Sequence, residues 1–164
     1  MDWKLELAFV PVSDVDRAKD FYVNKVGFNA DYDERPSDDI RFVQLTPPGS
    51  ACSICIGEGL TDAPPGSGSN LQLVVSDITA AHDFLKTNGV DVSDVDVQDW
   101  GHFVYFADPD GNKWSVQYIP WRNAGAGAAE SSAAQGAGGQ GNAAQGNSAQ
   151  GNSAQDNSAQ SPAP

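Results

Sequence analysis

An internal repeat is the feature of this sequence that most restricts its fold. The segment VSDVDRAKDF, residues 12–21, recurs as VSDITAAHDF, residues 75–84, with six of ten positions identical at an offset of 63. Downstream, PPGSACSICI, residues 47–56, aligns with PDGNKWSVQY, residues 109–118, at an offset of 62. Self-similarity of this kind indicates two copies of one supersecondary unit.

Each copy is predicted to have the element order βαβββ. Ser13 and Ser76 begin segments with apolar residues at helical spacing, and Gly27 and Gly89 are expected to end these helices. The glycines are already 62 apart, so the residue lost from the second copy lies at the end of its helix. Alternating segments predict strands over residues 4–12, 28–33, 40–46, 51–57, 70–75, 90–97, 102–107 and 113–119.

The folded part of the chain is predicted to end near Arg122. Residues 123–164 contain almost only Ala, Gly, Gln, Asn, Ser and Pro, and they repeat in pentads such as GNSAQ. Because this tail has no aromatic or branched aliphatic side chain to bury, it is expected to be disordered. We therefore predict one domain over residues 1–122, with a first module over residues 4–57 and a second over residues 69–120.

Charge and hydropathy exclude several classes of function. The net charge is −13, and removing Glu130 and Asp156, the only charged residues of the tail, leaves −11 for residues 1–122. Nine basic residues in so acidic a chain form no patch for a phosphate backbone, so nucleic acid is not an expected partner. No membrane span or signal peptide is expected either, and a cytoplasmic protein is predicted.

The repeat, with PVSDVDRAKDFY at residues 11–22 and FADPDGNKWSVQ at residues 106–117, resembles the vicinal oxygen chelate superfamily. This is the glyoxalase, bleomycin resistance protein and extradiol dioxygenase family. The resemblance covers the whole predicted domain and implies an α+β fold, in which two βαβββ modules form a curled mixed sheet around a trough. It implies no single activity, because members range from isomerases and dioxygenases to drug-binding proteins.

Many members of that superfamily hold a divalent metal in the trough. The resemblance places the four ligand positions at Leu7, Ile56, Asn70 and Tyr118, and the repeat offsets of 63 and 62 agree with this placement. Such a metal needs imidazole or carboxylate ligands, and none of the four residues supplies one. We therefore predict no metal and no other cofactor. A slip of one residue would move each position to the opposite face of its strand.

The same alternation predicts which side chains line the trough. The expected ligand-binding residues are Leu7, Phe9, Ile56, Asn70, Gln72, Trp114 and Tyr118. They would form an apolar, aromatic pocket with a few hydrogen-bonding groups, which is typical of a small-molecule site. The alternative is that these side chains fill the interior and leave little cavity.

No catalytic residue is identified. The segment DPDGN, residues 108–112, is interpreted as a hairpin turn and not as a pair of catalytic carboxylates. His82 is expected to lie partly buried at the edge of the second helix, without a functional role. For His102, no second group with matching spacing points to a role as a proton donor. Two cysteines three residues apart on one strand, Cys52 and Cys55, point to opposite faces and are expected to be reduced thiols.

Three functions remain open at this stage. The first is metal-free binding of a small aromatic or cationic organic molecule, similar to the bleomycin resistance branch. The second is a metal-dependent enzyme of the glyoxalase or dioxygenase type, and the third is a non-catalytic interaction module. A homodimer is expected, because a curled open sheet leaves edge strands that a partner would cover. Trp100 and Trp121 are expected near the interface or the trough mouth.

Overall fold

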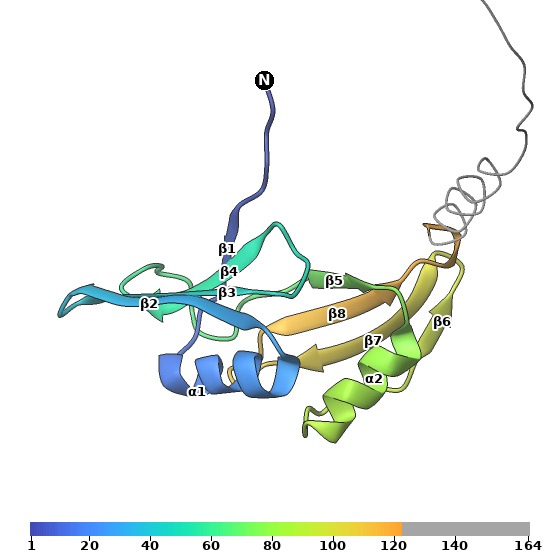
Figure 1. The fold of residues 1–164 in the computed structure, drawn as a ribbon. Helices are drawn as coiled ribbons and strands as arrows, with labels where there is room; N and C mark the ends of the chain where they lie inside the picture. Colours follow the sequence, from blue (N-terminus) through green and yellow to red (C-terminus); the bar gives the residue numbers. More distant parts are fainter. Residues whose placement is uncertain (123–164) are drawn as a thin grey trace, which may run out of the picture.

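The computed structural model describes residues 1–122 and shows the βαβββ order twice (Figure 1). The first module contains β1 (Leu7–Phe9), α1 (Val15–Asp20), the π-helix η1 (Phe21–Val26), β2 (Asn29–Ser37), β3 (Ile40–Thr46) and β4 (Ser53–Glu58). The second contains β5 (Leu71–Val75), α2 (Ile78–Thr87), β6 (Asp96–Gln98), β7 (Gly101–Ala107) and β8 (Lys113–Tyr118). The predicted α+β fold is confirmed. The predicted disordered tail, residues 123–164, lies outside the described residues.

Each module forms its own four-stranded mixed sheet. The strand orders are β1-β4-β3-β2 and β5-β8-β7-β6, so matching strands of the repeat occupy matching places. β1 and β5 are edge strands, parallel to β4 and β8, and the remaining pairs are antiparallel. Both helices lie on one side of the sheets, whereas residues 1–6 lead away on the other side (Figure 1). We call the side without helices the open face.

The helices begin one residue later than predicted. Asp14 caps the first helix by accepting a hydrogen bond from the backbone N–H of Arg17, and Asp77 caps the second in the same way. Gly27 ends the first helix with a left-handed φ of 86°, as predicted, and Gly89 follows the second with a φ of 74°. No helix within residues 1–122 is both long and apolar enough to cross a membrane.

The extra residue of the first copy is accommodated in the π-helical segment η1. Asp14 and Gly27 are 13 positions apart, whereas Asp77 and Gly89 are 12 apart. A π-turn spans one residue more than an α-turn, and α2 contains no such segment. The insertion therefore lies where the first helix carries Tyr22, which is fully buried.

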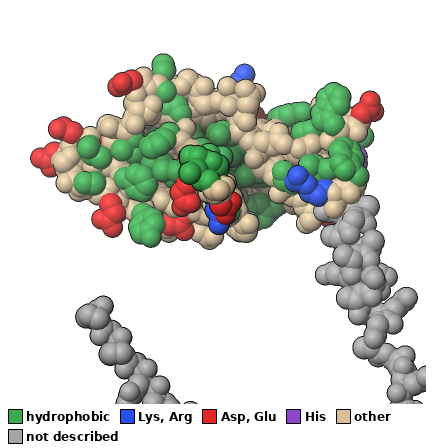
Figure 2. Space-filling model, turned by 90° about the horizontal axis from the view of Figure 1, so that it is seen from above, with side chains coloured by type: hydrophobic (Ala, Val, Ile, Leu, Met, Phe, Trp, Pro, Cys, Tyr) green, Lys and Arg blue, Asp and Glu red, His purple; other side chains and the backbone are tan. Residues whose placement is uncertain are grey.

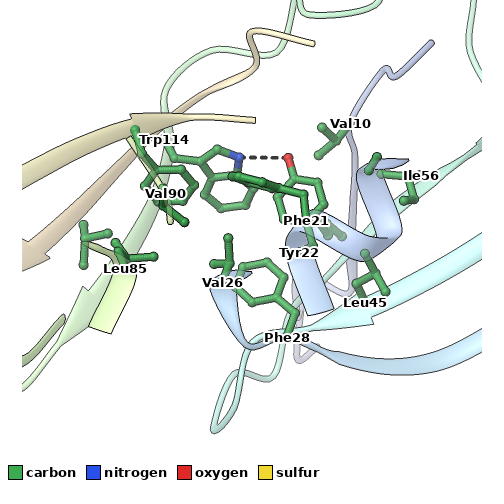
Figure 3. Packing of buried hydrophobic residues seen from close by; sticks show 14 of the residues in the cluster. Val10, Phe21, Tyr22, Val26, Phe28, Leu45, Ile56, Leu85, Val90 and Trp114 are labelled. Carbon is green, nitrogen blue, oxygen red and sulfur yellow. Dashed lines mark hydrogen bonds between the residues drawn. The ribbon is translucent and has the colours of Figure 1, made fainter. Parts of the chain in front are cut away.

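One apolar core connects the two modules. Its side chains come from the helix-facing sides of both sheets and from the helices, and include Val10, Tyr22, Val26, Leu45, Ile56, Leu85, Val90, Phe106, Trp114 and Val116. Figure 3 shows Tyr22 and Trp114 in contact in this core, with Val10 and Ile56 on one side and Leu85 and Val90 on the other. Because both modules contribute to one core, they are expected to unfold together.

Three strands differ in length from the prediction. β1 is shorter because its pairing with β4 stops at Glu6, whose carbonyl oxygen accepts from the backbone N–H of Ser53 at 2.9 Å. β2 is longer, with two irregularities in its pairing with β3, and β6 has only three residues. The remaining strands lie within two residues of their predicted bounds.

Candidate functional site

Strand register determines which side chains of the first sheet face the open side. Leu7 pairs with Ser53 and Phe9 pairs with Cys55 across β1 and β4. Paired residues of adjacent strands project to the same face, and Ile54, between the two β4 positions, belongs to the core. These four side chains therefore lie on the open face, over which hydrophobic side chains are spread (Figure 2).

The open face of the second sheet carries neutral polar groups. Gln72 pairs with Ser115 and Val74 pairs with Gln117 across β5 and β8, whereas Trp114 belongs to the core. The side-chain amide of Gln72 donates to the side-chain oxygen of Gln117 at 2.5 Å. Leu7, Phe9 and Gln72 thus point the expected way, and their role in binding remains a prediction.

The predicted orientation of β4 and β8 is wrong by one residue. Ile56 is 1% exposed and lies in the core. Tyr118 also points to the helix side, where its ring packs against that of His102 with centroids 5.6 Å apart. The physical reason is that the helices cover one face of each sheet, so the apolar residues of β4 and β8 turn to that face and leave Ser53 and Ser115 on the other.

A hollow of about 260 Å³ lies at the seam where the two modules meet. Its walls come from residues before and within β1, from the turn between β3 and β4, and from the start of β5. We call it the polar hollow, because four neutral polar side chains line it together with apolar ones. The lining residues are Leu5, Ala8, Pro47, Ser50, Cys52, Ser53, Ile54, Asn70, Leu71, Gln72, Leu73 and Trp114. Three of the predicted ligand-binding residues, Asn70, Gln72 and Trp114, therefore meet here.

A second hollow, of about 200 Å³, adjoins the first. Pro47 and Leu73 line both of them. We call it the apolar hollow, because every one of its lining side chains is apolar. They are Val26, Phe28, Pro47, Pro48, Leu73, Val74, Val75, Ala81, Phe84, Leu85, Phe106 and Val116.

Asn70 enters β5 in a left-handed conformation. Its φ of 63° is positive, and no other non-glycine residue within residues 1–122 has a positive φ. Asparagine adopts this conformation more readily than most residues, and such conformations cluster at binding sites. The backbone geometry thus gives independent reason to single out this residue of the polar hollow.

Buried hydrogen bonds from the first module hold Trp114 in place (Figure 3). The indole N–H of Trp114 donates to the Tyr22 hydroxyl at 3.1 Å, and this hydroxyl donates to Oδ2 of Asp108 at 2.8 Å. Burial, assisted by the negative charge of Asp108, raises the pKa of Tyr22 far above its ordinary value. The phenol therefore stays protonated and keeps its hydrogen bond to Asp108.

The DPDGN segment is the turn between β7 and β8, and its side chains form hydrogen bonds with the first module. The Asn112 amide donates to the backbone oxygen of Pro11 at 2.9 Å and to Asp108 at 2.7 Å. Oδ1 of Asp110 accepts hydrogen bonds from Ser13 and Arg17 of the first module. Burial acts to raise the pKa of Asp110, but these hydrogen bonds, together with a backbone hydrogen bond from Ser13 and the charge of Arg17, lower that pKa. The turn carboxylates thus hold the modules together, in agreement with the structural interpretation.

In the described part of the chain, residues 1–122, the histidines and cysteines do not assemble into a catalytic group. Nδ1 of His82 lies 2.9 Å from Asp83, and His102 faces the helix side. Cys52 and Cys55 are both free. Burial raises the pKa of the Cys55 thiol to about 11, so this group is a neutral thiol near pH 7. Neither histidine lines either hollow.

Comparisons with known proteins identify the family. The model of the Glyoxalase/Bleomycin resistance protein/Dioxygenase superfamily matches residues 4–116. This chain belongs to that superfamily.

Solved and curated proteins are similar to a large share of this superfamily member. It is 36% identical to TnmS3, an antibiotic binding protein from Streptomyces sp. CB03234, over 72% of this chain and 97% of that one, with a TM-score of 0.66. A superfamily member from Sphaerobacter thermophilus DSM 20745 is 29% identical, over 71% and 98% of the two chains, with a TM-score of 0.63. The uncharacterized protein YetH of Bacillus subtilis (strain 168) is 29% identical over 105 residues, which are 63% of this chain and 88% of YetH.

The residues of this superfamily member do not fit the divalent metal that many members bind. Ile56 and Tyr118 face the helices, and Leu7 has no donor atom. Within residues 1–122, no three His, Cys, Asp or Glu side chains are grouped so that they could hold an ion. Neutral hydroxyl and amide oxygens, as in Ser53 and Asn70, would leave a dication without charge compensation.

Sequence reasoning missed the contribution of the turn between β3 and β4. Pro47, Ser50 and Ser53 line the polar hollow from this turn and from the start of β4. A signal was present in the repeat, because Ser53 and Ser115 are 62 apart and each is followed by an apolar residue. Polar residues that alternate with apolar ones mark the open face of a half-covered strand.

Proposed function

We propose that this protein binds a small organic molecule at the seam between its modules, without a metal. The observation that carries the proposal is the polar hollow, in which Asn70 and Gln72 offer hydrogen bonds beside Trp114 and other apolar side chains. Sites for small molecules typically combine apolar walls with a few polar groups. Leu7 and Phe9 would extend this surface over the open face of the first sheet. The likeness to TnmS3, an antibiotic binding protein, supports the same class of function.

The chemistry of the two hollows favours binding over catalysis. Among residues 1–122, no His, Asp, Glu, Lys or Arg side chain lines either hollow. A general acid or base, or an activated nucleophile with its base, would need such a group. Cys52, which lines the polar hollow, has no lining histidine to deprotonate it. An enzyme of the glyoxalase or dioxygenase type would need a ligand set that these residues do not supply.

A thermal-shift screen of the full-length protein tests this proposal. The compounds are cationic antibiotics, thiols and aromatic metabolites, each measured with and without a chelator. A ligand at about 100 times its Kd should stabilise the fold by roughly 2.7 kcal/mol, to the same extent in both conditions. Ligand binding that appears only after nickel or manganese is added would contradict the proposal and favour an enzyme.

A single substitution then localises the ligand. Asn70→Gly keeps the left-handed backbone but removes the side-chain amide from the polar hollow. We expect affinity for a screened ligand to fall about fivefold, the effect of roughly 1 kcal/mol for one lost hydrogen bond. Gln98→Ala, which removes an amide outside both hollows, is the matched control and should leave affinity unchanged. Equal affinities for Asn70→Gly and the wild type would place the ligand elsewhere.

We further propose that the protein is a homodimer. Trp3 and Leu5 are 85% and 73% exposed and belong to residues 1–6, which lead away from the sheets (Figure 1). Phe9, at the end of β1, is 52% exposed. Trp100 and Trp121 are also exposed. Large apolar side chains in such number favour burial against a partner. Light scattering of the full-length chain at micromolar concentration should give a dimer mass, and a monomer mass would contradict this proposal.

A further inference from the structure

We propose that the seam binds an uncharged molecule of two unlike parts, a hydrogen-bonding part in the polar hollow and an apolar ring system in the apolar hollow. This inference rests on the proposed binding function and names the class of ligand. It favours an uncharged aromatic molecule over the cationic one that the sequence left open.

Size is the first argument for one ligand across both hollows. Their volumes are about 260 and 200 Å³. Small-molecule sites usually measure roughly 300 to 1,000 Å³, so neither hollow reaches this range alone, whereas the two together do. They are adjacent, because Pro47 and Leu73 line both. We infer that one ligand extends past these two side chains and occupies both volumes.

Chemistry changes at the boundary between the hollows. Ser50, Asn70 and Gln72 lie on one side of it, whereas Val26 and Phe84 on the other side can form no side-chain hydrogen bond. A molecule with polar groups along its whole length would lose hydration in the apolar hollow without compensation. The division of polar and apolar lining thus selects a ligand that is divided in the same way.

Charge is the third argument. Residues 1–122 have a net charge of −11, but none of their charged side chains lines either hollow. Several carboxylates are paired away from the seam, as in the ion pairs of Asp33 with Lys19 and Arg41. A cation at the seam would lose hydration without meeting a counter-charge, and the diffuse field of the protein is screened by salt. An uncharged ligand meets neither penalty.

Four matched probes test size and charge separately. Biphenyl-4-carboxamide has an uncharged amide and a second ring, whereas benzamide lacks that ring. Biphenyl-4-carboxylate and biphenyl-4-carboxamidine have nearly the same shape as the first probe but carry one negative or one positive charge. By calorimetry on the full-length protein, we expect biphenyl-4-carboxamide to bind at least tenfold more tightly than benzamide and at least fivefold more tightly than either charged probe.

Substitutions on α2 identify the apolar hollow as the place of the second ring. Ala81→Leu fills this hollow and should reduce the affinity for biphenyl-4-carboxamide to that for benzamide. Ala80→Leu, at an exposed neighbouring position outside the hollow, is the matched control and should change neither affinity. If Ala81→Leu does not fold, Phe84→Ala serves instead, because Phe84 lines the hollow yet is half exposed. It should lower the affinity for biphenyl-4-carboxamide about threefold and leave benzamide unchanged.

Each other outcome overturns a defined part of the account. Equal affinities for biphenyl-4-carboxamide and benzamide, or tighter binding of the amidinium probe, would overturn the inference. Binding of a screened ligand that depends on Asn70 but is not accompanied by binding of any biphenyl probe would also overturn it, while the proposed function would stand. If no probe and no screened compound bound, both would fall.

Discussion

The two modules have the same element order but differ on their open faces. In the core, Val15 of the first module matches Ile78 of the second, and both are buried apolar residues. On the open face, the sequence offset of 63 matches Phe9 of the first module with Gln72 of the second. The duplicated sequence thus retains the type of residue at this helix position. On the open face, where a ligand could make contact, the residue type differs between the copies.

The helices of the two modules show a second difference. Tyr22 of the first module and Leu85 of the second are equivalent and buried, but only Tyr22 can form a side-chain hydrogen bond. Its hydroxyl connects to Trp114 and Asp108 of the second module. The first helix, which has one residue more and contains η1, therefore makes a contact to the second module that the second helix does not make in return.

The largest expected effect on the free energy of unfolding is the difference between substitutions at Trp114 and Cys52, which are equivalent positions of the repeat. Trp114 lies in the core, whereas Cys52 is only partly buried. Trp114→Ala should lower the free energy of unfolding by about 3–5 kcal/mol, because it leaves a cavity. Cys52→Ala should lower it by less than about 1 kcal/mol. Urea denaturation of both variants measures the difference, and equal losses would contradict the asymmetry between the modules.

Removal of a single hydroxyl should have the next largest effect. Tyr22→Phe leaves the indole N–H of Trp114 without its acceptor and removes one donor to Asp108. We expect the free energy of unfolding to fall by about 1–3 kcal/mol. Tyr105→Phe, which removes an exposed hydroxyl from the open face, should change it by less than about 0.5 kcal/mol. If Tyr22→Phe left the free energy of unfolding unchanged, this hydroxyl would not stabilise the contact between the modules.

The smallest expected effect concerns the ion pairs of the first module. Hydrogen bonds from Arg41 and then Lys19 hold the pKa of Asp33 well below its ordinary value of about 3.9. A carboxyl group whose pKa is lowered by folding stabilises the protein above its unfolded pKa, and this contribution is lost as the pH falls toward the folded pKa. Between about pH 5 and about pH 2.5, the wild type should therefore lose about 1 kcal/mol more than Arg41→Met, a modest effect because these groups are partly exposed.

A control for this pH effect comes from the second module. Lys86 makes no ion pair within residues 1–122, so Lys86→Met should lose stability on acidification as the wild type does. Unfolding followed by circular dichroism at each pH gives the three curves. If the curve of Arg41→Met coincided with that of the wild type, the pairing of Asp33 with Arg41 would not be a source of acid sensitivity.

The repeat and its apolar spacing were sufficient to predict the βαβββ order. They do so because helix and strand periods follow from backbone geometry. The exact helix starts were not predictable in this way, since Ser13 and Asp14 are both good capping residues and only the three-dimensional contact distinguishes them. The short β1 was also not predictable from its own residues. Its length depends on how far β4 extends beside it, and the pairing stops at the hydrogen bond between Ser53 and Glu6.

The candidate site was predictable only in part. Asn70 and Gln72 could be placed from the alternation of the first strand of the second module. Ile56 and Tyr118 were misplaced because positions taken from the resemblance outweighed the polar and apolar pattern of the last strands. The contribution of Pro47 depends on how the β3–β4 turn meets the second module, and this contact between distant segments leaves no local pattern in the sequence.

The most direct test of the central claim is a crystal structure of the full-length protein with a ligand from the thermal-shift screen, prepared without chelator. The account predicts that the ligand lies at the seam, in contact with Asn70, Gln72 and Trp114, and that no metal ion joins it to the protein. A ligand coordinated to a metal ion, or bound only outside the two hollows, would contradict the claim that this protein binds small molecules at its seam without a metal.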